Sequence, residues 1–381
     1  MTPAPTVAIL ANRGFAITNS RLPLIARMRE AGWRVLLVTA DDAHARQVES
    51  LGATLETVEF HRGGLSPLRD LRTLARLTRL FARHRPDLVH FFHSKPVMLG
   101  SLAIAAVPGW RPKVVSTITG LGYAYLAGGI DWIAASAGYR ALTRRSDAVI
   151  FQNRDDLDVF VRRGWVRAEK ATLIESSGVD TAKFAPRPGA RRTVVMVSRL
   201  LRQKGVQEYL DAARAVAARH PETEFLLAGE IEAGHADGIP EEEILRGARD
   251  AGVRYLGYAT DVPGLLASAR MLVFPSYYRE GLPRIVIEAA ACAVPAVAAN
   301  VPGSRDAIEH GVTGLLVPPR DHGKLVEAIC ALLDDDGRCR AMGQEARGKA
   351  LAEFDLRLIT ERQLDVYRSL LGATLAGAGT A

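Results

Sequence analysis

The stretch RMLVFPSYYREGLPRIVIEAAACAVPAVAA, residues 270–299, decides the fold. Its apolar start, RMLVFPS, predicts a buried strand, and the apolar residues after Pro283 predict a helix, because proline suits the first helical turn. VPAVAA at 294–299 predicts the next strand. A strand, a helix and a second strand in this order are typical of a parallel sheet covered by helices.

The same alternation of apolar runs and helical patterns extends along the rest of the chain. A first series of strands is predicted at TVAILA (6–11), WRVLLVT (33–39), DLVHFF (87–92), KVVSTIT (113–119) and DAVIFQN (147–153). A second series is predicted at TVVMVS (193–198), EFLLAG (224–229), VRYLG (253–257), the two strands quoted above and TGLLV (313–317). Gly, Pro and charged residues separate the two series at 175–192, which is typical of a linker.

Two successive series predict an α/β protein of two Rossmann-like domains that face each other across a cleft. The predicted division is an N-terminal domain at 1–176, a linker at 177–192, a C-terminal domain at 193–355, a C-terminal helix at 356–371 that can pack back on the N-terminal domain, and a frayed tail at 372–381. A chain of 381 residues suits two domains of this size.

Composition narrows the class of protein and its location. The chain is 48% apolar and 24% charged, as in soluble globular proteins, and its net charge of +7 favours an anionic partner. Cys292, Cys330 and Cys339 lack metal-ligand spacing, so we expect reduced thiols. No signal-peptide pattern occurs, and no apolar run approaches the roughly 18 residues of a membrane span. We therefore expect a cytoplasmic protein, with any membrane contact peripheral, at the cytoplasmic face of the inner membrane.

Two cations stand at the start of the second series. Arg199 follows the strand TVVMVS, and Lys204 stands with Gly205 at the start of the next predicted helix. Beyond the carboxyl ends of parallel strands, helix N-termini and cations bind anions. Arg199 and Lys204 could therefore neutralise a diphosphate. The alternative is a solvated pair at a turn.

Two carboxylates follow the strand RMLVFPS. Glu280 lies just before the predicted helix, at the mouth of the expected cleft, and Glu288 lies inside that helix among apolar residues. Burying an unpaired carboxylate is costly, so Glu288 should meet hydroxyl or N–H donors. A ribose diol would supply them, and the alternative is an ion pair with Arg284, one turn earlier.

Taken together, these motifs resemble one family. Its pattern includes S-R-L-x3-K-G at 198–205, E-G-x-P-x4-E-A at 280–289 and VPGSRDAIEHGVTGLLVPPRD at 301–321. SSGVDTAKFAP at 176–186 matches its usual N-G-V-D-x3-F-x-P, with Ser177 in place of Asn. The chain thus resembles the retaining GT-B glycosyltransferases of the E-x7-E type, the glycosyl transferases group 1.

The resemblance implies a role for each motif residue. Glu280 would face the hydroxyls of the donor sugar, and Glu288 would hold the ribose diol. Arg199 and Lys204 would grip the diphosphate. Further donor contacts are expected from Gly14, Gly281 and Leu282. The family needs no metal or other cofactor, because cations and helix dipoles stabilise the leaving nucleotide diphosphate.

The first domain offers weaker signals. Gly14, in the loop NRGFAITNSR, could let backbone N–H groups reach a phosphate. HFFHSKP at 90–96 follows a strand and would expose His93 and Lys95 at the cleft. By resemblance His93 contacts the donor sugar, with His90 as the second choice, although a single histidine is more often structural.

HSKPVMLG together with TITGLGYAYL at 117–126 resembles a narrower group. Its members extend glycans on a polyprenyl-diphosphate carrier or build capsule and O-antigen units. Tyr123 and Tyr125 could line an acceptor-side loop, or the segment could be a glycine-rich connection with packed aromatic rings.

A basic helix is predicted at 68–83. Its members form two adjoining stripes, one of Arg69, Arg72, Arg76, Arg79 and Arg83, the other of Leu68, Leu71, Leu74, Leu77, Leu80 and Phe81. Basic amphipathic helices favour anionic membrane surfaces. The alternative is a solvated basic face with the leucines turned to the core.

The predicted function is transfer of a hexose or N-acetylhexosamine from a nucleotide diphosphate, UDP being favoured, to a hydroxyl of a lipid-linked glycan, with retention of configuration. A nucleotide-sugar epimerase or phosphorylase on the same scaffold is the alternative. A dinucleotide-dependent oxidoreductase should carry G-x-G-x-x-G after its first strand, and neither series does. No nucleic-acid partner is expected, because no recognised binding module occurs.

Overall fold

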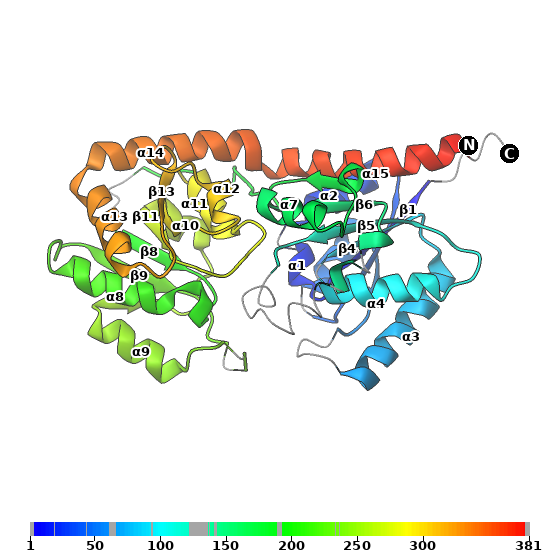
Figure 1. Ribbon diagram of the computed structural model, residues 1–381, viewed down its shortest axis with the longest axis horizontal. Helices are drawn as coiled ribbons and strands as arrows, with labels where there is room; N and C mark the ends of the chain where they lie inside the picture. Colours follow the sequence, from blue (N-terminus) through cyan, green and yellow to red (C-terminus); the bar gives the residue numbers. More distant parts are fainter. Residues whose placement is uncertain are drawn as a thin grey trace. The chain divides into compact units, whose positions relative to one another are not determined.

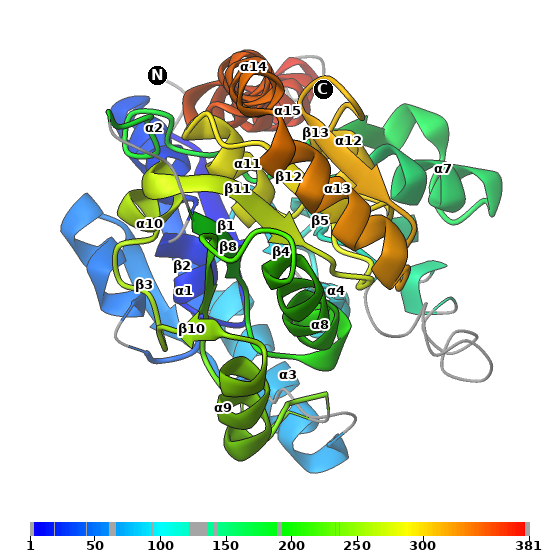
Figure 2. The same ribbon diagram turned by 90° about the vertical axis from the view of Figure 1, so that its left-hand side faces the viewer.

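The computed structural model describes residues 4–18, 20–42, 44–60, 66–92, 94–121, 136, 138–140, 143–188, 193–232, 234–235 and 237–377. The chain divides into two compact units (Figures 1 and 2). The first unit comprises Met1–Ser177 and Leu356–Ala381, and the second comprises Gly178–Asp355.

The first unit is a parallel sheet of seven strands in the order β3-β2-β1-β4-β5-β6-β7. Its strands are β1 (Thr6–Leu10), β2 (Arg34–Thr39), β3 (Thr54–Thr57), β4 (Leu88–Phe92), β5 (Lys113–Ile118), β6 (Ala148–Phe151) and β7 (Ala171–Leu173). Its helices are α1 (Phe15–Thr18), α2 (Leu22–Glu30), α3 (Pro67–His84), α4 (Ser94–Ala105), α7 (Arg154–Arg162) and α15 (Leu356–Gly377), with 3-10 turns at Ala45–Leu51 and Ala168–Lys170.

The second unit is a parallel sheet of six strands in the order β10-β9-β8-β11-β12-β13. Its strands are β8 (Thr193–Val197), β9 (Glu224–Ala228), β10 (Val253–Tyr255), β11 (Ala269–Phe274), β12 (Ala296–Ala299) and β13 (Gly314–Val317). Its helices are α8 (Val206–Ala217), α9 (Glu241–Asp250), α10 (Val262–Ser268), α11 (Arg284–Ala291), α12 (Ser304–Ala307), α13 (His322–Asp334) and α14 (Asp336–Lys349), with a 3-10 turn at Arg202–Lys204 and a π-helical turn at Ala350–Phe354.

The strands of the second unit are largely apolar because helices cover both faces of the sheet (Figure 2). Val194 and Met196 of β8 are buried in one core with residues of α8 and α13. Val195, between them, is buried on the other face with residues of α10 and α11. Successive side chains of a strand point to opposite faces, so one short run supplies both cores.

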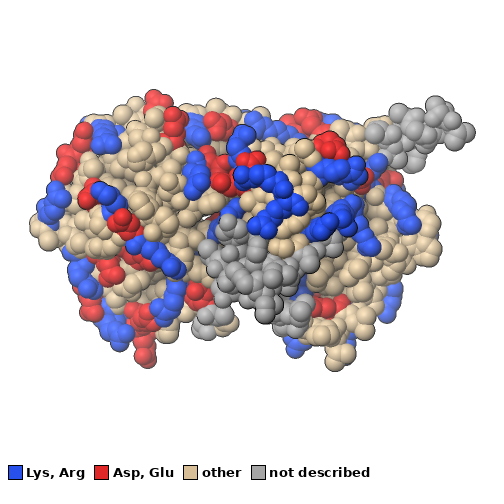
Figure 3. Space-filling model, in the orientation of Figure 1, with Lys and Arg blue, Asp and Glu red and all other residues tan. Residues whose placement is uncertain are grey.

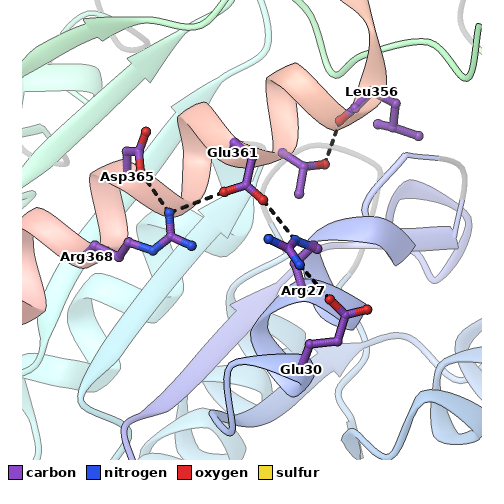
Figure 4. Close-up of polar contacts among 7 residues, drawn as sticks. Arg27, Glu30, Leu356, Glu361, Asp365 and Arg368 are labelled. Atoms are coloured by element: carbon purple, nitrogen blue, oxygen red, sulfur yellow. Dashed lines mark hydrogen bonds and ion pairs between the residues drawn. The ribbon is translucent and has the colours of Figure 1, made fainter.

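The last helix, α15, belongs to the first unit although it follows the second in sequence. Its apolar side chains, among them Ile359 and Tyr367, are buried in one core with residues of β1 and α2. Burial of each large apolar side chain contributes roughly 1.5–3 kcal/mol. At the surface, Arg27 of α2 bridges Glu361 of α15, at 2.9 Å, and Glu30, at 2.7 Å (Figure 4).

The first part of the segment predicted as a linker, residues 179–184, packs in the core of the second unit. Val179 is fully buried and its N–H donates to the carbonyl of Phe354 at 2.8 Å. Phe184 lies in the same core. These contacts hold the first residues of the second unit against its last turn, at Phe354.

Candidate functional site

Three loops meet at the carboxyl edge of the second sheet. They follow β8, β11 and β12 and are called here the carboxyl-edge loops (residues 198–205, 275–283 and 300–303). β8 and β11 are neighbours although they are not consecutive, so the strand order reverses between them. At such a switch point the loops diverge and leave room for a ligand.

Backbone contacts lock the first two of these loops together. The N–H of Tyr277 donates to the carbonyl of Gln203 at 3.1 Å, and the hydroxyl of Ser276 donates to the same carbonyl at 3.3 Å. Gly205 has a φ of +79°, and a Cβ there would lie 2.5 Å from the carbonyl oxygen of Pro275. Only glycine allows both this backbone conformation and this close approach.

The third loop lies against the second. Gly303 has a φ of +82°, and a Cβ there would overlap the carbonyl oxygen of Gly281. Its own N–H donates to the carboxylate of Asp306 at 3.1 Å, inside the first turn of α12. The three loops therefore form one continuous surface around Gly281.

Lys204 and Glu280 are brought together on this surface. The Lys204 ammonium forms an ion pair with Oε1 of Glu280, and the residue is only 7% exposed. The same nitrogen lies 5.1 Å from the ring centre of Tyr278 and 5.8 Å from that of Phe274, within range of cation–π attraction. A buried ammonium is thus held between a carboxylate and two aromatic rings.

Arg199 has a different partner. Its guanidinium is half exposed and lies 3.4 Å from Oε1 of Glu232, in the loop after β9. Nothing in the sequence pointed to Glu232, since a single acid in a long polar loop carries no pattern. The structure therefore pairs each predicted cation with an acid from a separate loop.

Glu288 forms the local ion pair that the sequence offered as an alternative. Nη2 of Arg284 lies 3.0 Å from Oε1 of Glu288, one helical turn away, and the Glu288 side chain is 12% exposed. A second bond, from Nε of Arg284, ends on the same oxygen at 3.3 Å. Both bonds that this carboxylate accepts from described side chains end on Oε1, so Oε2 can accept from another donor.

In the first unit, Gly14 contacts a neighbouring part of its own chain. Its N–H donates to Oδ2 of Asp42 at 2.9 Å, and a Cβ would overlap Asp42 and Ala45. This N–H group is therefore engaged by a carboxylate. His93, Tyr123 and Tyr125 lie outside the described residues.

His90 is fully buried within the first unit. Its Nε2 lies 2.7 Å from the hydroxyl of Thr117, and its Nδ1 is hydrogen-bonded to the hydroxyl of Tyr367. Burial, assisted by the nearby Arg21 guanidinium, holds the pKa of His90 well below its usual value, so the ring stays neutral. Both ring nitrogens are occupied, which gives His90 a structural role.

Lys95 was expected at the cleft but is largely buried. Its ammonium lies 3.0 Å from Oδ1 of Asp70, which ties α4 to α3. Across the described residues, no three His, Cys, Asp or Glu side chains gather closely enough to hold a metal ion. Within the same described residues, none of the helices has the length and apolar character that a membrane-spanning segment requires.

Comparison with known proteins places the chain in a family. Residues 17–176 match the glycosyl transferase 4-like domain and residues 191–335 match the glycosyl transferases group 1 domain. A Mycolicibacterium smegmatis protein, GDP-mannose-dependent alpha-(1-6)-phosphatidylinositol monomannoside mannosyltransferase, is 30% identical over 74% of this chain and 76% of its own length. The N,N'-diacetylbacillosaminyl-diphospho-undecaprenol alpha-1,3-N-acetylgalactosaminyltransferase of Campylobacter jejuni is 25% identical over 95% of this chain and 98% of its own.

The fold has close counterparts among solved structures. The crystal structure of Anabaena HepE in complex with UDP-glucose superimposes with a TM-score of 0.79 over 96% of this chain and all of that one, at 21% identity. The two Rossmann-like units with parallel sheets correspond to the GT-B architecture predicted from the sequence. The chain therefore belongs to the glycosyl transferases group 1 family and is a glycosyltransferase of the GT-B fold.

Proposed function

We propose that this glycosyltransferase moves a hexose or N-acetylhexosamine from UDP to a hydroxyl of a polyprenyl-diphosphate-linked glycan, with retention of anomeric configuration. The observation that carries the proposal is the buried Lys204–Glu280 pair, at the point where the strand order reverses. The lipid-linked acceptor is supported by the name of the Campylobacter jejuni relative, which includes a diphospho-undecaprenol.

Three side chains of the carboxyl-edge loops and one of α11 have a part in this chemistry. The donor diphosphate replaces Glu280 as the partner of Lys204, and Glu280 turns to the hydroxyls of the sugar. Arg199 adds a second cation, and Oε2 of Glu288 accepts from the ribose. Cations fixed in advance around a developing charge stabilise the departing diphosphate without a metal ion.

Retention follows from positioning rather than from a protein nucleophile. The leaving diphosphate oxygen takes the proton of the acceptor hydroxyl, which attacks from the face that the diphosphate leaves. The protein then has to hold two substrates and neutralise charge, which suits a site of fixed cations. Gly281 and Leu282 contribute contacts at the start of α11, where N–H groups lack helical partners.

Screening nucleotide sugars for thermal stabilisation, followed by transfer to a short polyprenyl-diphosphate glycan, tests this function. We expect a UDP-sugar to raise the melting temperature most and NMR of the product to show the donor's anomeric configuration. Strongest stabilisation by GDP-mannose would contradict the choice of base, since the mycobacterial relative depends on that donor by name. An inverted anomer would contradict the mechanism.

We also propose that α3 contacts an anionic membrane surface. The five arginines of its basic stripe, from Arg69 to Arg83, are all exposed. Leu68 and Leu71 are 76% and 62% exposed, whereas Leu77 and Phe81 are fully buried. The helix therefore anchors one end in the core and presents apolar and basic side chains together at the other.

Changing Arg72, Arg76 and Arg79 to Glu should lower binding to anionic vesicles at least tenfold, since each basic residue near such a surface contributes about 1 kcal/mol. Flotation with phosphatidylglycerol vesicles measures this. The matched control changes three exposed arginines elsewhere in the first unit, Arg162, Arg167 and Arg362, to Glu. Equal loss in both variants, or none in the first, would exclude α3 as the contact surface.

A further inference from the structure

A cavity lies at the edge of the second sheet opposite the carboxyl-edge loops. It has a volume of about 880 Å³ and is called here the amino-edge cavity; its lining includes Arg270 near the start of β11 and Pro295 immediately before β12. In a parallel sheet the amino ends of all strands lie at one edge and the carboxyl ends at the other. The amino-edge cavity is therefore separate from the carboxyl-edge loops.

The lining of the amino-edge cavity is strongly basic. Among the residues that the structure describes, it contains Arg187, Arg270, Arg340 and Arg347 and one acid, Asp336, so the formal charge of this described lining is +3. Figure 3 shows basic and acidic side chains interspersed over the face of the second unit that it draws. A concave surface of one sign concentrates the electric field and attracts ligands of the opposite charge.

Two of the arginines are fixed by helix ends. Arg270 donates to the carbonyls of Leu332 and Leu333 at the end of α13, at 2.8 and 2.9 Å. Arg347 donates through Nη1 to the carbonyl of Ala291, the last residue of α11. Guanidinium groups held in this way lose little entropy when they bind a further acceptor.

Asp336 already marks a position where an anion sits between guanidinium groups. One of its oxygens pairs with Arg270, and the other lies 3.3 Å from Nη1 of Arg340. Nη1 of Arg187 lies 3.9 Å from Oδ2 of Asp261, which is a long distance for an ion pair. The five N–H donors of each guanidinium exceed these bonds, so Arg187, Arg340 and Arg347 keep donors for a ligand.

We propose that the amino-edge cavity binds a phosphorylated ligand with an apolar part. Phosphate accepts the paired N–H groups of arginine in the geometry that carboxylates use, and its higher charge suits a lining of +3. The apolar part lies against Pro186, Pro188 and Leu351. The volume is within the range of small-molecule pockets. Hydrogen bonds to helix-end carbonyls explain the positions of Arg270 and Arg347, but Arg187 and Arg340 make no such bonds among the described residues.

Calorimetric titration of the full chain with pyrophosphate tests the proposal. A variant with both Arg199→Ala and Lys204→Ala serves as background, so that the two cations proposed to hold a diphosphate at the carboxyl-edge loops are removed. We expect one saturable site, and adding Arg187→Glu and Arg340→Glu should weaken it at least tenfold. The matched control adds Arg249→Glu and Arg338→Glu, which are exposed on α9 and α14 outside the lining, and should change affinity less than twofold.

Equal weakening by both pairs, or no saturable heat in the background, would overturn the proposal. Unchanged melting temperatures of the variants establish that the fold survives. Repeating the titration with ADP and with geranyl diphosphate distinguishes a nucleoside from a prenyl chain as the apolar part. If neither binds more tightly than pyrophosphate, the apolar part of the proposal is wrong. Both variant pairs are compared in the same background. The difference between their affinities for pyrophosphate therefore tests the amino-edge cavity even if the donor-site assignment is wrong.

Discussion

Lys204→Ala should lower kcat/KM for the nucleotide sugar at least 100-fold, about 2.7 kcal/mol of transition-state stabilisation. Lys204 is 7% exposed and lies between Glu280 and two aromatic rings. In this water-poor position a charge–charge contact is screened weakly, so its loss is costly when negative charge develops on the diphosphate. Steady-state kinetics with the best donor from the screen measures the effect.

Lys324→Ala is the matched control for this prediction. Lys324 lies on α13 of the same unit, its side chain is 58% exposed, and it pairs with Glu327 at 2.7 Å. The same loss of charge there should leave kcat/KM within twofold. Near-normal turnover of Lys204→Ala would reject the assignment of the donor diphosphate to this lysine, whatever the effect at Lys324.

Gly205→Ala should destabilise the protein by about 2–4 kcal/mol and abolish measurable donor binding. The added methyl group would meet the carbonyl of Pro275 at 2.5 Å, so the two carboxyl-edge loops would have to separate. Separation also breaks the bonds from the second loop to Gln203, beside Lys204. Urea unfolding and calorimetry with UDP report stability and binding separately.

Gly252→Ala is the control that separates the clash with Pro275 at Gly205 from the strain of a left-handed backbone. Gly252 has a φ of +66°, close to that of Gly205, but a Cβ there would meet no atom within 4 Å. We expect it to lose only the roughly 1 kcal/mol that a left-handed conformation costs alanine, with UDP binding intact. Equal effects of the two substitutions would mean that loop contact at Gly205 has no role.

The central strands of both sheets were predictable because they are buried on both faces and therefore continuously apolar. β3, with the sequence TLET, and β7 were not predicted. They are the two edge strands of the first sheet and are only partly buried, so their side chains need not be apolar. β3 is held by backbone pairing to Leu36–Thr39, which leaves no mark on its side-chain pattern. The edge strands of the second sheet, β10 and β13, were predicted because they carry buried apolar side chains such as Val253 and Leu315.

The sequence predicted which loops carry the candidate site. It did not predict all the ion-pair partners of the side chains in them. Motif spacing identified Lys204 and Glu280, and the topology explains why residues 76 positions apart meet, since β8 and β11 are neighbours. The partner of Arg199, Glu232, depends on how a long loop folds back. That path is set by backbone contacts such as the one from Arg202 N–H to the carbonyl of Asp237.

The return of α15 to the first unit has a consequence for synthesis on the ribosome. When residue 177 has been made, the sheet containing β1 still lacks the helix that covers part of one face, and His90 lacks its hydroxyl partner on Tyr367. At about 5–20 residues per second, that helix is completed roughly 10–40 s later. The half of the molecule that is translated first is therefore the half that matures last.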